Sequence, residues 1–160
     1  MRAWAKLSGC RRYRYVLVRE WNTSVPALVV IGLNPSTADE TVDDPTIRRC
    51  VGFARRFGCG SLRMLNLFAL RSTDPAALRS ELDPIGPDTD YWLRREVDPA
   101  RGAVCVAAWG MHGKYLNRGR EVRRLVGEQL HHLGLTKDGY PRHPLYLRAD
   151  TPLIPWGIPA

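Results

Sequence analysis

The chain has 160 residues, of which 44% are hydrophobic and 25% are charged, a composition typical of one ordinary globular domain. It contains no apolar run near the roughly 20 residues that a membrane-spanning helix needs. Its basic start also lacks the apolar stretch of a secretory signal. We therefore expect a single domain over residues 1–160 that is cytoplasmic, monomeric and without a membrane partner.

The charge is strongly positive. Lys and Arg together number 24 against 16 acidic residues, and nearly all of these cations are arginines. The planar guanidinium group suits phosphate oxygens, so a polyanionic partner is favoured, although a solvated basic surface explains the same composition. The four cysteines contain no C-x-x-C pair, and we expect buried free thiols and no metal site.

Taken in chain order, the first patterned segment is residues 12–21, where partial alternation of apolar and charged residues predicts a half-exposed strand at or near a sheet edge. Residues 27–31 form a short apolar run before Gly32, which predicts a strand buried on both faces. Asp44 and the proline after it then supply a helix N-cap and first position. We expect this helix to end near Phe57.

Three further apolar runs, at residues 62–67, 103–108 and 130–135, alternate with helix-compatible segments at residues 75–82, 89–97 and 119–129. This alternation predicts right-handed crossovers and helices on both faces of the sheet. The predicted fold class is therefore α/β, a three-layer sandwich around a mostly parallel sheet of four to five strands. The Pro-rich tail from Thr151 is expected to be irregular.

In open parallel sheets, ligands bind at the carboxyl ends of the strands. The segments that leave the four core strands carry unusual polar and aromatic residues, which are Asn34, Asn66, Trp109, Arg142 and His143. Each of them alone has a structural explanation, such as a turn, a packed strand end or a cap. Together they predict one aromatic-lined cleft with a few convergent polar groups, the usual form of a binding site.

These segments also resemble motifs of a known superfamily. Residues 32–35, Gly-Leu-Asn-Pro, resemble the first motif of uracil-DNA glycosylases in its asparagine-containing form, and His143-Pro144 resembles the second motif. Residues 65–71 and 106–112 resemble the ends of the two strands that lie between these two motifs in the glycosylases. Taken whole, the sequence is identified as a member of the bacterial domain-of-unknown-function family sixteen-forty-three, which brings no established activity.

The glycosylase resemblance implies a role for each matching residue. Asn34 would position the attacking water, His143 would donate a hydrogen bond to the departing base, and Asn66 would read the edge of a flipped pyrimidine. Asp43 or Asp44 is a rival general base, with helix capping as the alternative role of Asp44. The remaining base-binding candidates are Gly32, Leu33, Pro35, Phe53, Phe68 and Trp109, and the phosphate-binding candidates are Ser36, Arg48, Arg49, Arg71 and Arg142.

The sequence departs from the resembled pattern after the histidine, where Leu145 and Tyr146 replace a serine and a proline. The paired cysteines of iron–sulfur members are missing, so no cluster is expected, and no G-x-G-x-x-G or P-loop motif predicts another cofactor. We expect a DNA-repair hydrolase that removes a damaged or modified base, with DNA favoured over RNA as the partner. Two alternatives stay open: a hydrolase or transferase acting on RNA or a free nucleotide, favoured by the acidic segment at residues 37–44, and a non-catalytic nucleic-acid binder.

Overall fold

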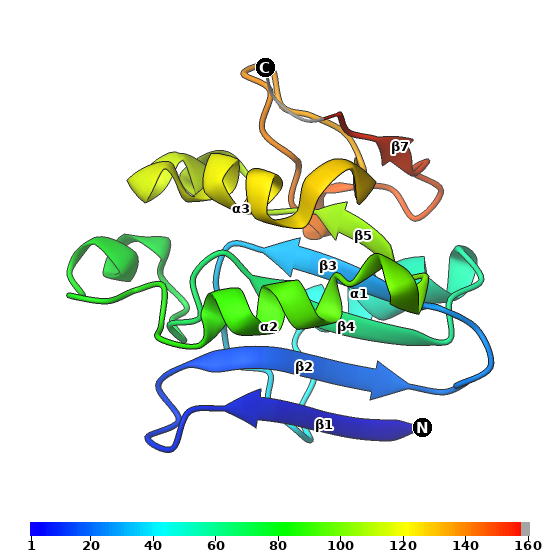
Figure 1. The fold of residues 1–160 in the computed structure, drawn as a ribbon, viewed down its shortest axis with the longest axis horizontal. Helices are drawn as coiled ribbons and strands as arrows, with labels where there is room; N and C mark the ends of the chain where they lie inside the picture. Colours follow the sequence, from blue (N-terminus) through cyan, green and yellow to red (C-terminus); the bar gives the residue numbers. More distant parts are fainter. Residues whose placement is uncertain (158–160) are drawn as a thin grey trace.

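The computed structural model describes residues 1–157 of the chain. Its centre is a seven-stranded sheet with the strand order β1-β2-β4-β3-β5-β6-β7 (Figure 1). The strands are β1 (Arg2–Leu7), β2 (Arg14–Glu20), β3 (Ala27–Gly32), β4 (Ser61–Asn66), β5 (Val104–Ala107), β6 (Leu130–His132) and β7 (Ile154–Pro155). The α-helices are α1 (Pro45–Arg56), α2 (Thr89–Glu96) and α3 (Arg118–Val126).

Four neighbouring strands, in the order β4-β3-β5-β6, run parallel and form the middle of the sheet. The register pairs Gly32 with Asn66 and Ile31 with Ala107. The carboxyl ends of β3, β4 and β5 therefore lie side by side at one edge of the sheet. This arrangement brings together the loops that follow these strands.

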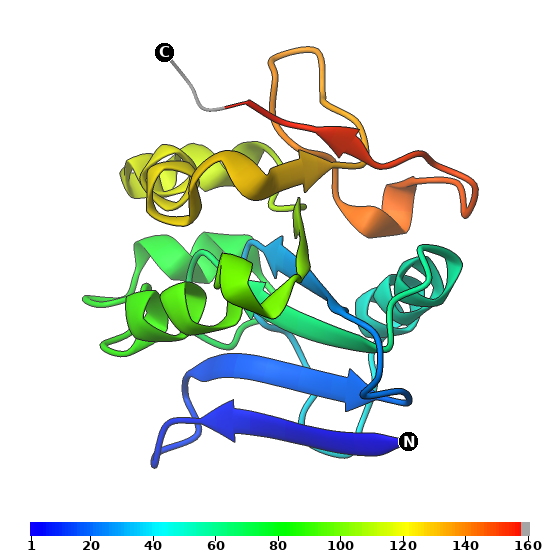
Figure 2. The same cartoon turned by 45° about the vertical axis from the view of Figure 1, so that its right-hand side comes forward.

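Helices cover both faces of the sheet. On one face, α1 buries Ile47, Cys50 and Phe53 against β3, β4 and β5. On the other face, α2 and α3 bury apolar side chains such as Leu93 and Val122. Figure 2 shows α1 on one side of the strands and α2 and α3 on the other. The predicted α/β class with helices on both faces is thus confirmed.

The helix α1 begins as the sequence predicts. The carboxylate oxygen Oδ1 of Asp44 accepts a hydrogen bond from the backbone N–H of Ile47 at 2.8 Å, and Pro45 occupies the first helical position. The helix ends at Arg56, next to the predicted Phe57, which is its C-cap. Its first turn lies beside the carboxyl ends of the parallel strands, because Thr46 and Ile47 border the same cavity as Gly32 and Asn66.

The predicted size of the sheet was wrong. It has seven strands instead of four to five, and it is mixed, because β1, β2 and β7 pair antiparallel with their neighbours. β1 lies in the basic start of the chain, and β7 lies in the tail that was expected to be irregular. β7 has only two residues, and so short a strand carries little sequence signal.

The prediction for residues 12–21 was also wrong in part. β2 lies between β1 and β4, and six of its seven residues are buried, including Arg14 and Arg19. The alternation of charged and apolar residues therefore does not mark a half-exposed strand here. Buried arginines need partners inside the protein, and only the tertiary structure supplies them.

The helix-compatible segments differ in outcome. Residues 89–97 and 119–129 contain α2 and most of α3, but residues 75–82 form only a 3-10 helix, Pro75–Arg79. Within residues 1–157, no helix combines the length and the apolar character that a membrane crossing requires.

Candidate functional site

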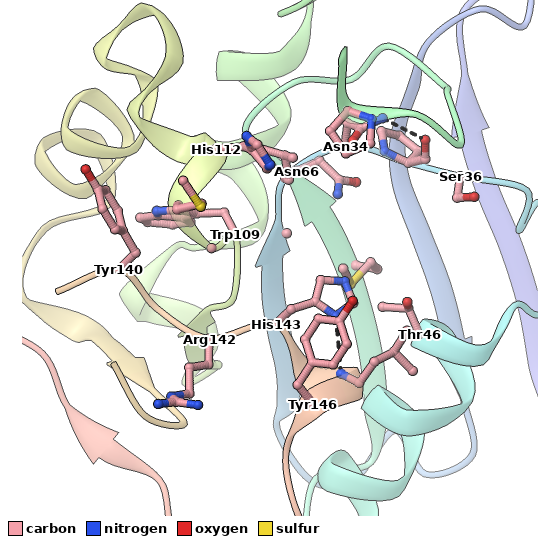
Figure 3. Close-up of a pocket in the computed structure, with 18 of the residues that line it drawn as sticks. Asn34, Ser36, Thr46, Asn66, Trp109, His112, Tyr140, Arg142, His143 and Tyr146 are labelled. Atoms are coloured by element: carbon pink, nitrogen blue, oxygen red, sulfur yellow. Dashed lines mark hydrogen bonds between the residues drawn. The ribbon is translucent and has the colours of Figure 1, made fainter. Parts of the chain in front are cut away.

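A cavity of about 810 Å³ opens at the carboxyl ends of β3, β4 and β5. It is lined by the strand ends, the first turn of α1, and the loops at residues 32–36, 72–75, 109–112 and 136–146. Its polar and aromatic lining includes Asn34, Ser36, Thr46, Asn66, Trp109, His112, Tyr140, Arg142, His143 and Tyr146 (Figure 3). The site lies where the topology predicts a ligand site for parallel strands.

Asn34 is held by hydrogen bonds that leave one of its side-chain atoms free. Its Nδ2 donates to the carbonyl oxygens of Pro35, Leu70 and Ser72 at 3.2, 3.3 and 3.1 Å. Its Oδ1 accepts no hydrogen bond from any described residue. The side chain is therefore fixed through its donor and presents an acceptor in the cavity lining.

Asn66 ties the ends of β3 and β4 together. With its amide oriented so that both atoms are satisfied, Oδ1 accepts from the backbone N–H of Asn34 at 3.3 Å, and Nδ2 donates to the carbonyl of Leu65 at 3.2 Å. Asn66 is only 3% exposed. An amide has two lone pairs and two N–H groups, so each atom retains capacity for one further hydrogen bond.

His143 differs from Asn34 because the side-chain atom that it leaves free is a hydrogen-bond donor. The backbone N–H of Leu145 donates to Nδ1 at 3.2 Å, so this nitrogen is an acceptor and the proton of the neutral ring lies on Nε2. Burial lowers the pKa of His143 below its ordinary value of 6.5, and the charge of Asp44 partly offsets this effect. The ring is therefore a neutral Nε2–H donor at pH 7, and it lies 5.6 Å from the Tyr146 ring between centroids.

Trp109 supplies the aromatic wall at the end of β5. It is 3% exposed, and its ring packs against that of Trp156 at 5.8 Å between centroids. Gly113 makes this position possible, because a Cβ there would lie 2.2 Å from the indole Cδ1. The wall is thus closely packed, and Trp156, the residue after β7, helps to support it.

The acidic segment at residues 37–44 uses its carboxylates within the protein. Asp39 accepts from the backbone N–H groups of two following residues, and Asp44 caps α1. Glu40 pairs with Arg11 at 2.9 Å, and Asp43 pairs with Arg19 at 2.8 Å. Of these carboxylates, Asp44 alone lines the cavity. Local ion pairs and caps therefore offset most of the negative charge beside the site.

The structure brings together many of the residues that the sequence proposed for the site. The candidates that line the cavity are Gly32, Leu33, Asn34, Pro35, Ser36, Asp44, Asn66, Trp109, Arg142 and His143. Arg142 is held at the rim, where its Nε donates to the carbonyl of Leu135 at 3.1 Å. Residues more than a hundred positions apart in the chain, such as Asn34 and His143, thus share one cavity.

Other candidates lie elsewhere. Phe53 and Phe68 are 2% and 0% exposed and pack in the two cores on opposite faces of the sheet, so neither ring lines the cavity. Arg48 and Arg49 border a separate groove of about 490 Å³ along α1. Arg71 borders a third hollow. Of the two rival bases, Asp43 points to its ion pair with Arg19 instead of the cavity.

Several lining residues were missed by the sequence analysis, notably Arg14, Thr46 and Tyr140. Thr46 could have been found, because it lies in the first turn of a helix that follows a core strand. Arg14 gave no signal, since it stands among four arginines within residues 11–19 and only the fold shows which of them is buried.

The fold and the cavity together define an α/β protein with a polar cavity at the carboxyl ends of its parallel strands. Residues 14–145 match the family model described as protein of unknown function (DUF1643), and the chain belongs to this family. This confirms the family identified from the sequence. Neither the curated proteins nor the solved structures contain a significant match.

Among the described residues, no group of three or more His, Cys, Asp or Glu side chains is arranged to hold a metal ion. Cys50 and Cys105 are buried, and burial raises the pKa of each thiol to about 12. A thiol with so high a pKa is a poor nucleophile at neutral pH, because the thiolate is the reactive form. No cysteine of the described chain lines the cavity, whose polar side chains carry amide, imidazole, hydroxyl, carboxylate, ammonium and guanidinium groups.

Proposed function

We propose that this protein is a hydrolase of N-glycosidic bonds, related in fold and chemistry to the uracil-DNA glycosylases, that removes a damaged or modified base from nucleic acid. One observation carries the proposal. Asn34 and His143 line the same cavity, and the hydrogen bonds that fix them leave an acceptor free on Asn34 and a donor free on His143.

Cleavage of an N-glycosidic bond needs these two functions. Positive charge develops on the sugar and negative charge on the leaving base, while a water attacks the sugar. The free Oδ1 of Asn34 would accept a hydrogen bond from this water and orient it. The Nε2–H of His143 would donate to the oxygen of the base as negative charge accumulates there, a preorganised contact that strengthens in the transition state.

Asn66 would recognise the base. Its amide retains one donor and one acceptor position, which can match the edge of a pyrimidine. Its bonds to Leu65 and to the backbone of Asn34 hold the amide in one orientation. A base with the wrong pattern would leave a buried polar group unpaired, which costs about 1–3 kcal/mol. Trp109 would form part of the apolar wall.

Asp44 is the second candidate for activating water. Its Oδ1 is occupied by the N-cap bond to Ile47, and its charge acts on the His143 ring. An aspartate that serves only as a cap can be replaced by asparagine, which caps a helix equally well. A general base cannot be replaced in this way, so the two roles are separable by one substitution.

The basic surface beside the cavity favours a nucleic-acid substrate. The groove along α1 is bordered by Arg48, Arg49 and Arg56, and it shares Leu145 with the lining of the cavity. Arginines placed next to a base pocket would hold the phosphates of a strand whose base enters it. DNA is the substrate that we favour, with RNA or a free nucleotide as alternatives.

The test is release of base from defined substrates. The protein would be incubated with a panel of oligonucleotides carrying uracil, mismatched or modified bases, and with the corresponding ribonucleosides and nucleotides. Free base would be measured by chromatography, and abasic sites by alkali-labile strand breaks. We expect release by the native protein, severe loss in Asn34→Ala and His143→Ala, and native activity in Asn22→Ala, a matched amide variant at an exposed position outside the cavity.

If the folded protein releases no base from any member of the panel, the hydrolase proposal is wrong. Salt-sensitive binding to oligonucleotides that Asn34→Ala leaves unchanged would then support a non-catalytic nucleic-acid binder.

A further inference from the structure

Three arginines of the described chain are almost completely buried: Arg14 and Arg19 on β2, and Arg118 at the start of α3. A buried cation is costly unless it is paired and hydrogen-bonded. The ion pairs and hydrogen bonds of each guanidinium group therefore show whether the protein supplies all the partners that the group needs.

Two of the three are satisfied within the protein. Arg19 pairs with Asp43 at 2.8 Å and donates further hydrogen bonds to the carbonyls of Val18 and Asp39 at 2.9 and 2.6 Å. Arg118 pairs with Asp90 at 2.5 Å and donates to the carbonyl of Leu67 at 2.8 Å. Both charges thus have a carboxylate within ion-pair distance.

Arg14 differs from both. It is 2% exposed, yet it forms no ion pair with any described residue. Its Nη1 donates to the carbonyl of Ala38 at 2.9 Å, while its Nε is fully buried without a partner, and its Nη2 donates to no described residue. Burial lowers the pKa of Arg14 to about 10, against the opposing charge of Asp44, so the group still carries its charge at neutral pH.

The position of Arg14 indicates where its missing partner belongs. Arg14 borders the 810 Å³ cavity together with Ser36, Thr46 and Thr73, whose hydroxyl groups can donate hydrogen bonds. The first turn of α1 contains no acidic residue, and its positive end lies at the same place. The charge of Asp44 acts on Arg14, but this carboxylate is outside ion-pair distance, and its Oδ1 accepts the hydrogen bond of the helix cap.

We propose that Arg14 is the anchor of an oxyanion subsite in the cavity, which binds a phosphate or carboxylate group of the ligand. The guanidinium supplies the charge through Nη2, and the hydroxyl groups of Ser36 and Thr46 supply further donors. This subsite goes beyond the proposed hydrolysis, because it concerns binding and requires no turnover. A nucleotide fits both parts of the cavity, since its base would reach Asn66 and its phosphate would reach Arg14.

The subsite is tested by binding of inorganic phosphate, measured by isothermal titration calorimetry at constant ionic strength with chloride as the reference anion. We expect saturable binding at one site of the native protein. Arg14→Met, which keeps the apolar stem and removes the charge, should bind phosphate at least about 10-fold more weakly, the loss expected for a charge-assisted hydrogen bond. Arg14→Lys should bind with intermediate affinity, because it keeps the charge without the planar fork.

Arg120→Met is the matched control. It removes one positive charge from an exposed position on α3, outside the cavity, and should bind phosphate as the native protein does. Acetate and a nucleoside 5′-monophosphate, compared with the nucleoside alone, then separate a carboxylate from a phosphate as the natural group. A preference for the monophosphate that Arg14→Met abolishes supports the nucleotide form of the ligand.

Two results would overturn the subsite. One is phosphate binding to the native protein that does not exceed the effect of chloride, and the other is equal phosphate affinity in Arg14→Met and the native protein. Base release can persist in either case, so failure of the subsite and failure of the proposed hydrolysis are distinguishable. Should Arg14→Met not fold, phosphate affinity is compared between the native protein and Arg14→Lys, which retains the charge.

Discussion

Polar side chains at the two ends of the parallel strands differ in how their charged and hydrogen-bonding groups are satisfied. At the amino ends, a small hollow of about 160 Å³ holds Glu20, Arg63, Glu96 and Arg101. Arg63 pairs with Glu96 at 2.8 Å and with Glu20 at 3.7 Å, and Arg101 lies 3.6 Å from Glu96. These charges satisfy one another.

At the carboxyl ends, Asn34, His143 and Arg14 each keep an atom that no described residue satisfies. Polarity and burial therefore do not by themselves mark a functional site. The ion-pair network at the amino ends is also charged and includes the buried Glu96, but there each charge has an opposite charge of the protein beside it. Free hydrogen-bonding capacity in a large cavity distinguishes the carboxyl ends.

The largest expected effect is on catalysis at the carboxyl ends. Asn34→Ala and His143→Ala should each lower the rate of base release by about 10²–10³-fold, since each removes a preorganised contact to the transition state. The double variant should lose less than the product of the two effects, because both groups act on one reaction step. Single-turnover kinetics on the active substrate measure these rates, and a loss below threefold in either single variant contradicts the assigned role.

A second effect, on stability, should appear at the amino ends. Glu96→Gln removes a carboxylate whose side chain is 2% exposed and leaves Arg63 without its shortest ion pair. We expect the free energy of unfolding to fall by about 1–3 kcal/mol. Base release at a temperature where the variant is folded should be unchanged. Denaturant unfolding and activity assays check the two parts, and a loss of activity in the folded variant would place this network in the function.

The pH dependence should reflect His143. Its folded pKa lies below the ordinary value of 6.5, so the ring is neutral in the folded protein at pH values where the unfolded chain already binds a proton. Its contribution to stability is therefore fully present above pH 6.5 and declines as the pH falls. Base release should likewise be constant at neutral pH and fall as the pH drops through the lowered pKa of His143.

Asp44→Asn sharpens this prediction. Asparagine keeps the helix cap, while loss of the carboxylate removes the charge that raises the His143 pKa. The acid limb of the activity profile should therefore move to lower pH with the maximal rate retained. Glu40→Gln, an exposed acid that pairs with Arg11, serves as the control and should leave the limb in place. A hundredfold fall in the maximal rate of Asp44→Asn would instead identify Asp44 as the general base.

The smallest effect should be on the stability of Arg14→Met. Removal of an unpaired buried charge should leave the free energy of unfolding unchanged or raise it by up to about 1 kcal/mol. Arg19→Met should lower it, since Asp43 and two carbonyls would lose their donor. Thermal and denaturant unfolding measure the two changes in the free energy of unfolding. They compare an arginine that has an ion pair with one on the same strand that has none.

The sequence by itself determined the parallel middle of the sheet and the position of the cavity. Continuous apolar runs such as residues 27–31 can be buried on both faces only in a covered sheet, and Asp44-Pro45 specify a helix start through local hydrogen bonds. Because the ends of parallel strands converge, Asn34, Asn66 and His143 could be assigned to one cavity before any coordinates were known.

Only the tertiary structure decided the antiparallel strands, the placement of Phe53 and Phe68 in the cores and the state of the buried arginines. Arg14 and Arg19 lie on the same strand, yet Arg19 pairs with Asp43 and Arg14 forms no ion pair with a described residue. Local patterns specify periodicity and caps, because those depend on residues a few positions apart. Whether a charge finds its partner depends on segments that only folding brings into contact, and at Arg14 that partner is left for a ligand to supply.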